Sequence, residues 1–235
     1  MSIKPYGLIC PITKACEILE PRWTIPILAE LWCGSTRFND IRRGVGHISP
    51  GLLSKRLKEL EALGLVERVE DRAQGTVDYF RTPMAIALEP ALNALANWSQ
   101  EYVKAETVVS GVDVETLMWK MREHIDPALL PRKRVVIRFH FNDEGLEYDT
   151  YWALIHEEGT IEICTEIPDF DVHLYVETTS PSLTAILLAR TSIERELESE
   201  RLYLSGDAKL ARTMPDWLIQ TEYMCENRLA YRAAG

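Results

Sequence analysis

Residues 49–64, SPGLLSKRLKELEALG, constrain the fold of this chain more than any other stretch. Ser49 is a good N-cap, Pro50 suits the first helical position, and Gly64 can adopt the left-handed conformation that ends a helix. At 100° per residue the leucines share one face, and small or basic residues share the opposite one. The segment therefore predicts an amphipathic helix that buries one face and offers the other to an anion. The leucines are Leu52, Leu53, Leu57, Leu60 and Leu63, and the opposite face carries Gly51, Ser54, Lys55 and Lys58.

The charge of the chain is unevenly distributed around this helix. The 235 residues carry a formal net charge of −10. Residues 1–105 contain 13 Lys+Arg and 12 Asp+Glu, whereas residues 106–235 contain 13 and 24. Within residues 37–60, by contrast, six basic residues outnumber two acidic ones. A basic patch centred on this helix of an acidic chain indicates a local nucleic-acid contact.

Helical spacing also predicts helices over residues 12–20, 22–33 and 36–43. Pro26 lies inside the second of these, where it would remove one hydrogen bond and bend the helix. A turn with glycine at residues 44–48 joins the third helix to the helix of residues 49–64. Two helices joined by a tight turn, the second basic on its outer face, predict a helix-turn-helix.

The period changes from helix to strand after Gly64. Two short strands, 65–70 and 76–81, flank a polar loop, which predicts a β-hairpin and hence a winged helix. A last helix follows Thr82, and its apolar residues form a seam of near-heptad spacing that predicts a dimer contact. A two-fold partner suits the half-sites of duplex DNA, which repeat about every 34 Å. The seam consists of Leu88, Leu92, Leu95, Trp98 and Tyr102.

Five separated motifs in this half resemble the HxlR-type winged-helix transcriptional regulators, over roughly residues 8–104. The resemblance implies a homodimer built from the N-terminal helix, with Ile12, and the last helix. It also implies that the helix of residues 49–64 enters the major groove and that the hairpin is the wing. Cys10 matches a position that senses oxidants in some members, so it is a candidate redox thiol. The motifs are Cys10-Pro11-Ile12, Arg22-Trp23-Thr24, Arg37 to Arg43, Ile48 to Leu57, and Leu63 to Arg68.

The residues expected to touch DNA lie on the two helices of the helix-turn-helix and in the hairpin loop. Outward basic and small polar side chains meet phosphates and base edges there, and wings often meet phosphate or the minor groove. The alternative is a solvated face, on which Lys55 pairs with Glu59. Arg56 lies beside the leucines and is expected to be structural. The expected DNA contacts are Arg37, Arg42, Arg43, Ser49, Gly51, Ser54, Lys55, Lys58, Arg72 and Gln74.

The second half predicts an α+β domain, so that the chain consists of a winged helix-turn-helix domain, residues 1–108, and a second domain, residues 109–235. A helix over 112–125 precedes an antiparallel meander with one apolar face, which on the second strand carries Tyr148, Thr150, Trp152 and Leu154. Helices follow and cover this mainly antiparallel sheet. The strands are 133–141, 146–156, 160–164 and 171–178; the later elements are helices 181–189 and 192–199, strand 201–204 and helix 208–219.

The order of these elements, with the Gly206-Asp207 turn, is similar to the sterol-carrier-protein-type lipid-binding domain over roughly residues 115–218. That resemblance implies an apolar tunnel between sheet and helices for an acyl chain or another hydrophobic small molecule. Aromatic residues of this kind are more often core than ligand-lining. The candidate lining residues are Trp119, Phe139, Tyr148, Trp152, Ile163, Leu174, Ile186 and Leu187.

Other site chemistries receive no support from the sequence. The five cysteines (Cys10, Cys16, Cys33, Cys164 and Cys225) are scattered without CxxC pairs, which predicts reduced thiols and neither disulfides nor zinc. His140, His156 and His173 have no metal-ligand spacing, and no nucleophile stands with a base, so we expect no metal, no cofactor and no enzyme. No apolar run is long enough for a membrane span, which predicts a cytoplasmic protein.

The sequence therefore predicts a homodimeric transcription regulator that binds a double-stranded, pseudo-palindromic operator and whose acidic second domain binds an apolar effector. One alternative is a carrier or enzyme for hydrophobic substrates, in which the winged helix serves mainly for dimerisation. Another is a second domain that only packs against a partner or its dimer mate.

Overall fold

The computed structural model describes residues 5–104, 109 and 111–220. The described residues form two compact units, one ending at Leu95 and the other beginning at Ala96. The predicted domain boundary between residues 108 and 109 falls next to residues outside the described ranges. Ser110 and Cys225 also lie outside these ranges. The boundary therefore stays a prediction.

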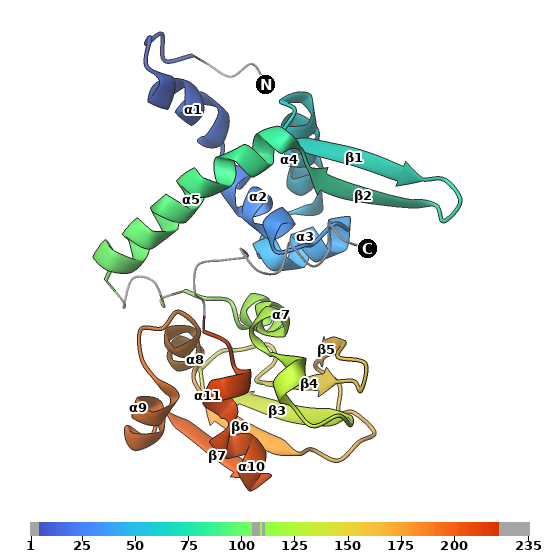
Figure 1. Ribbon diagram of the computed structural model, residues 1–235, viewed down its shortest axis with the longest axis vertical. Helices are drawn as coiled ribbons and strands as arrows, with labels where there is room; N and C mark the ends of the chain where they lie inside the picture. Colours follow the sequence, from blue (N-terminus) through green and yellow to red (C-terminus); the bar gives the residue numbers. More distant parts are fainter. Residues whose placement is uncertain (1–4, 105–108, 110, 221–235) are drawn as a thin grey trace. The chain divides into compact units, whose positions relative to one another are not determined.

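The first unit is a winged helix (Figure 1). Its helices α2, α3 and α4 pack around one core, and the β1–β2 hairpin extends away from them. The leading residues of this core are Ile27, Leu28, Ile41, Leu53 and Leu57, which are 0–1% exposed. The elements are α1 (Pro11–Leu19), α2 (Thr24–Trp32), α3 (Phe38–Val45), α4 (Pro50–Ala62), β1 (Val66–Asp71), β2 (Thr76–Arg81) and α5 (Pro83–Tyr102), of which the part up to Leu95 belongs to this unit.

Helix α4 confirms the amphipathic helix predicted from the sequence. The hydroxyl of Ser49 accepts a hydrogen bond from the backbone N–H of Leu52 at 3.3 Å, which caps the helix. Gly64 has a φ of +73°, the left-handed conformation that a glycine adopts without strain. Leu57 and Leu60 are buried in the core of the unit.

Helix α2 begins two residues later than predicted, so the predicted loss of a hydrogen bond at Pro26 is wrong. Trp23, with a φ of 81°, is the N-cap, and the helix starts at Thr24. Pro26 therefore lies in the first turn, where a backbone N–H has no acceptor within the helix. The missing N–H of proline costs no intrahelical hydrogen bond there.

The second unit contains a five-stranded sheet whose order differs from the predicted meander. The strand order is β5-β4-β3-β6-β7. Strand β6 does not join β5; it pairs with β3 in parallel, and the other three pairings are antiparallel. The meander is thus wrong at its fourth strand, whereas a mainly antiparallel sheet is confirmed. The strands are β3 (Val135–Phe141), β4 (Thr150–Ile155), β5 (Ile161–Cys164), β6 (Leu174–Thr178) and β7 (Leu202–Gly206).

Helices cover one face of this sheet and share its core (Figure 1). The predicted helix over 208–219 is two helices that meet at Thr213, because Pro215 is tolerated only in the first turn of a helix. The elements are α7 (Val114–His124), the 3₁₀ turn η1 (Pro127–Leu129), α8 (Ser180–Leu187), α9 (Ile193–Glu198), α10 (Ala208–Arg212) and α11 (Met214–Trp217).

The face of β4 that meets the helices is the opposite of the predicted one. Tyr151, Ala153 and Ile155 belong to the main core, whereas Trp152 and Leu154 form a small cluster on the other face. Both faces of β4 are apolar, so its alternation could not identify the core side. The sheet therefore has one face under helices and a second face with its own apolar residues.

A buried carboxylate joins three elements of the second unit. Glu196 on α9 accepts hydrogen bonds from Arg201, just before β7, at 2.8 and 2.7 Å. It also accepts from Ser182 of α8 at 2.6 Å and from Thr191 at 2.8 Å. These donors, Arg201 foremost, lower the pKa of Glu196 to about 2. The site is a fully paired structural ion pair.

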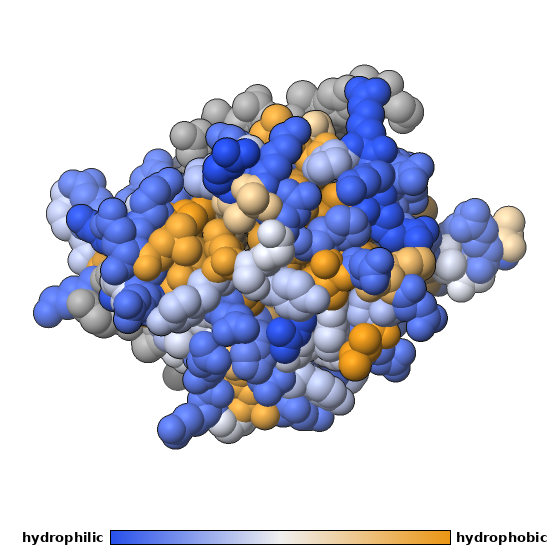
Figure 2. Space-filling model, turned by 90° about the horizontal axis from the view of Figure 1, so that it is seen from below, coloured by the Kyte–Doolittle hydropathy of each residue, from blue (hydrophilic) through white to orange (hydrophobic). Residues whose placement is uncertain are grey.

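The surface of the molecule mixes polar and apolar residues. On the face shown in Figure 2, hydrophobic residues gather in separate patches bordered by hydrophilic ones. Among the described residues no helix has the length and apolar character needed to cross a membrane.

Candidate nucleic-acid interface

The outward face of α4 carries the residues that the sequence assigned to it. Gly51, Lys55 and Lys58 are exposed, and Ser54 is half-buried. A Cβ built on Gly51 meets no atom within 4 Å, so the backbone there faces open space. The N-terminal turn of a helix also presents free N–H groups and a positive dipole end. This face thus combines two cations, a hydroxyl and an approachable backbone.

The last turn of α3 adds positive charge ahead of α4. Arg42 and Arg43 are both exposed there. His47, in the turn between the two helices, is exposed as well and was not among the predicted contacts. Its position in the turn between the two helices could have indicated a DNA contact, but a single histidine does not predict one by itself.

Arg37 differs from the other predicted DNA contacts because its side chain forms an ion pair with the β1–β2 hairpin. Its Nε lies 2.8 Å from Oδ1 of Asp78 on β2. The hydroxyl of Thr36 donates to the same Oδ1 at 2.8 Å, and the carbonyl of Thr36 accepts from the N–H of Tyr79 at 2.9 Å. The start of α3 is therefore fixed to the hairpin, and the guanidinium of Arg37 takes part in that attachment.

The tip of the hairpin is held in one shape by Asp71. Its Oδ1 accepts from the backbone N–H groups of Ala73 and Gln74 at 2.9 and 3.1 Å. Arg72 and Gln74 are exposed at this tip. The side chains of the tip are thus presented from an ordered turn.

Arg56 is structural, as expected from its position beside the leucines. It pairs with Glu59 at 2.5 Å, and only 17% of its side chain is exposed. Ser49, by contrast, is exposed while its hydroxyl oxygen caps α4, so its O–H can still donate to a phosphate.

The predicted dimer seam changes character along α5. Leu88 is half-buried and Leu92 is 7% exposed in the core of the first unit. Leu95, Trp98 and Tyr102 are 54–65% exposed. Ile12 on α1, the other helix of the predicted dimer, is 75% exposed. The dimer contact stays a prediction, and the exposed apolar residues are available for it.

Cys10 stands at the N-cap of α1. Hydrogen bonds from the backbone and the side chain of Thr13, and from the backbone of Ile12, lower the pKa of its thiol. Cys164 on β5 shows the opposite behaviour, because burial raises its pKa. Cys10 is therefore the more readily ionised of these two thiols.

The residues predicted to line an apolar tunnel fall into two groups. Phe139, Leu174, Ile186 and Leu187 are 0–3% exposed in the packed core, where Ile163 also packs, so they would face a cavity only if the core opened. The structure does not favour this part of the prediction.

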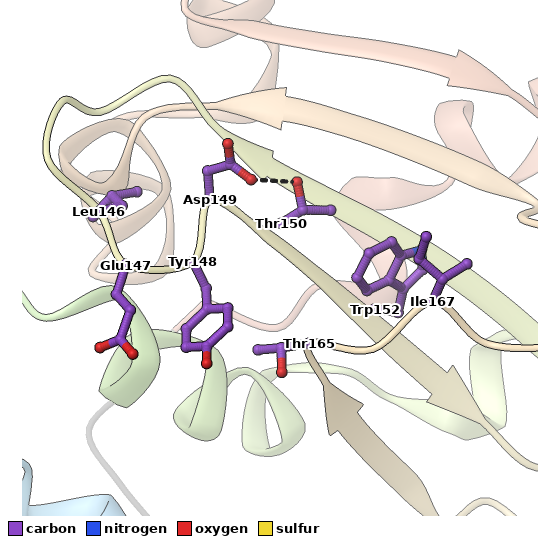
Figure 3. A pocket seen from close by; sticks show the side chains of 8 residues that line it. All are labelled: Leu146, Glu147, Tyr148, Asp149, Thr150, Trp152, Thr165 and Ile167. Carbon is purple, nitrogen blue, oxygen red and sulfur yellow. Dashed lines mark hydrogen bonds between the residues drawn. The ribbon is translucent and has the colours of Figure 1, made fainter.

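The other aromatic candidates lie elsewhere. Trp119 on α7 is half-buried beneath the guanidinium of Arg122, 3.4 Å from the ring centroid. Tyr148 and Trp152 line an open pocket at the edge of the sheet (Figure 3).

One protein family and several known proteins match a part of this chain. Residues 18–107 match the HxlR-like helix-turn-helix family. The uncharacterized HTH-type transcriptional regulator YvaP of Bacillus subtilis is 37% identical over 97 residues, which are 40% of this chain and 90% of that protein. The uncharacterized HTH-type transcriptional regulator YtfH of Escherichia coli is 32% identical over 90 residues, 38% of this chain and 71% of that protein.

A solved structure shows a similarity of the same extent. The reduced form of the transcriptional regulator YodB from B. subtilis is 28% identical, covers 41% of this chain and 97% of that chain, and has a TM-score of 0.37.

Proposed function

The chain belongs to the HxlR-like helix-turn-helix family of transcriptional regulators, and from this premise we propose that it binds a pseudo-palindromic DNA operator as a homodimer. The observation that carries the proposal is the outward face of α4, on which Lys55 and Lys58 are exposed opposite the buried leucines. Helix α4 enters the major groove, and the hairpin tip contacts the backbone beside it.

The residues on the outward face of α4 make different kinds of contact with DNA in this proposal. Lys55 and Lys58 neutralise phosphates, which supplies affinity that falls with salt. The hydroxyl of Ser54 can donate to or accept from base edges, and Gly51 lets the helix backbone come close to the groove wall. Arg42 and Arg43 of α3 and Arg72 of the hairpin meet phosphates on either side. Arg37 acts on DNA through the position of the hairpin.

The dimer places two copies of α4 on successive half-sites. Exposed apolar residues on α1 and the C-terminal part of α5 supply the contact. Ile12, Leu95, Trp98 and Tyr102 would bury apolar surface in it, and aromatic residues are the usual anchors of such interfaces.

The second unit is the regulatory part of this proposal. A small-molecule effector bound there changes operator occupancy only if it binds the DNA-competent and the incompetent dimer with different affinity. Residues 106–235 carry an excess of acidic residues, so this part of the chain does not attract DNA.

The test is DNA binding by the full chain with Lys55→Ala/Lys58→Ala. An operator is first selected from random duplexes with the purified protein, and its affinity is then measured by fluorescence anisotropy at several salt concentrations. The variant should bind at least about tenfold more weakly, with a salt slope lower by ~2. Lys133→Ala/Lys209→Ala removes the same charge from the second unit and should leave both quantities unchanged. Equal affinity and slope for the first variant would overturn the assignment of α4.

A further inference from the structure

A pocket of about 400 Å³ lies at one edge of the sheet in the second unit (Figure 3). Strands β4 and β5 are antiparallel, and Trp152 pairs with Cys164. The segment before β4 and the segment after β5 therefore lie at the same end of this strand pair. Tyr148 comes from the first of these segments and Ile167 from the second.

The pocket offers aromatic and aliphatic surface. Trp152 extends from β4 on the sheet face opposite the main core, in a small cluster with Val136 and Leu154. Tyr148 is 52% exposed and Ile167 is 80% exposed. Trp152 is only 7% exposed, so an apolar ligand would gain burial mainly against Tyr148 and Ile167, and the ring of Tyr148 offers its negative face.

The polar part of the pocket is acidic. Glu147 and Asp149 line it, and none of its lining residues is Lys or Arg. Asp149 accepts a hydrogen bond from the Thr150 hydroxyl at 2.8 Å and lies 3.8 Å from Nδ1 of His140. Glu147 has no ion-pair partner within the part of the chain that the structure describes.

The basic residue opposite Trp152 in the sheet is directed elsewhere. Arg138 of β3 is paired with Trp152 on one side and with Tyr175 of β6 on the other. The guanidinium carbon of Arg138 lies 5.9 Å from the ring centroid of Tyr175, so this cation interacts with the ring on β6, away from Trp152. The carboxylates of the pocket are not neutralised by it.

Glu147 also acts on Tyr151, whose side chain belongs to the main core on the other face of β4. Burial, followed by the charges of Glu115, Asp113 and Glu147, raises the pKa of Tyr151 to about 12. Of these charged residues only Glu147 lines the pocket.

We propose that this pocket binds aromatic or amphipathic organic cations, such as quaternary ammonium compounds. Aromatic rings attract cations to their faces, and two carboxylates beside them add electrostatic complementarity. The pocket lies open at the start of β4 and the end of β5, so it differs from the tunnel between sheet and helices that the resemblance to sterol-carrier proteins implies. The proposal does not depend on DNA binding.

The test is isothermal titration calorimetry of the full chain with benzyltrimethylammonium. Benzyl alcohol, which is neutral, and benzenesulfonate, which is an anion, serve as probes of matched aromatic size. The cation should bind at least about tenfold more tightly than either. The proposal is overturned if benzyl alcohol binds as tightly as the cation, or if the cation shows no binding at ~10 mM.

Two variants locate the binding. Glu147→Gln/Asp149→Asn should weaken the affinity for the cation about tenfold, because two nearby charges are lost. Glu157→Gln/Glu198→Gln removes two exposed carboxylates elsewhere in the second unit, and screening should keep its effect within about twofold. An equal loss in both variants would show a general charge effect and would overturn the pocket as the binding site.

Discussion

The Nε of Arg37 and the Oδ1 of Asp78 lie 2.8 Å apart, so the helix-turn-helix and its wing are joined by an ion pair. Asp78→Asn should therefore weaken operator binding by about threefold or more, even though it removes a negative charge close to DNA. The reason is that the hairpin loses its attachment to α3. Fluorescence anisotropy with the selected operator measures the effect.

A control on the same hairpin separates position from charge. Glu67→Gln removes an exposed carboxylate of β1, so its affinity for DNA should stay equal or rise. If Asp78→Asn also bound more tightly, the ion pair would have no role in placing the wing.

Gly44→Ala should destabilise the first unit. A Cβ at this position of α3 would overlap the carboxylate of Glu30, which is 2% exposed and accepts from the hydroxyl of Ser35 at 2.6 Å. Overpacking of this kind costs roughly 1–3 kcal/mol. A lower midpoint in thermal unfolding checks it, and an unchanged midpoint would mean that Glu30 moves aside freely.

Gly51→Ala should separate folding from DNA binding. The site is open and helical, so alanine should keep or raise stability, by up to ~1 kcal/mol. The added methyl group would keep the α4 backbone away from the groove, and affinity for the operator should fall about tenfold. Thermal unfolding and anisotropy on one sample give both values. Undiminished binding would place the backbone of Gly51 away from DNA.

Glu196→Gln should destabilise the second unit in a pH-dependent way. The pKa of Glu196 in the folded chain is about 2. Because this value is below that of an unfolded glutamate, the stabilisation is complete above about pH 4.3 and is lost as pH falls toward 2. A shift of about two units corresponds to ~3 kcal/mol at neutral pH.

Urea unfolding at several pH values tests this linkage. The difference between the native chain and Glu196→Gln should shrink between pH 5 and pH 2. Glu198→Gln, an exposed change on the same helix, should show no such difference. A constant gap across the range would assign the effect to packing.

Cys10 should react with iodoacetamide faster than Cys164 at pH 7.5. The thiolate is the reacting species, and hydrogen bonds lower the pKa of Cys10 whereas burial raises that of Cys164. Peptide mass spectrometry after timed labelling measures both rates. Equal rates would remove the basis for treating Cys10 as a redox thiol.

The sequence predicted the helix-turn-helix well because its signals are local. Ser49, Pro50 and Gly64 mark the ends of α4 within one short segment, and the leucine spacing identifies its buried face. The pairing of Arg37 with Asp78 was not predictable, because it joins residues 41 positions apart through the hairpin. Local patterns contain no information on such contacts.

The second unit was harder to predict because its sheet depends on non-local pairing. The alternation of β6 is the same whether it joins β5 or β3, so the parallel partner could not be read from it. The pocket beside Trp152 was missed for a related reason, since both faces of β4 are apolar. Tyr148 and Trp152 were selected as ligand-lining residues, but for a tunnel between the sheet and the helices.

The parallel pairing of β3 with β6 also has a consequence for biosynthesis. In the central strand β3, Ile137 pairs with Leu174 of β6, which is synthesised 37 residues later. The last strand of the sheet, β7, is synthesised later still, at Leu202–Gly206. The first unit ends at Leu95, within α5, and it can fold while the ribosome is still making that sheet. Because long-range strand pairing is slow, the nascent chain acquires a DNA-binding shape before it acquires the unit proposed to regulate it.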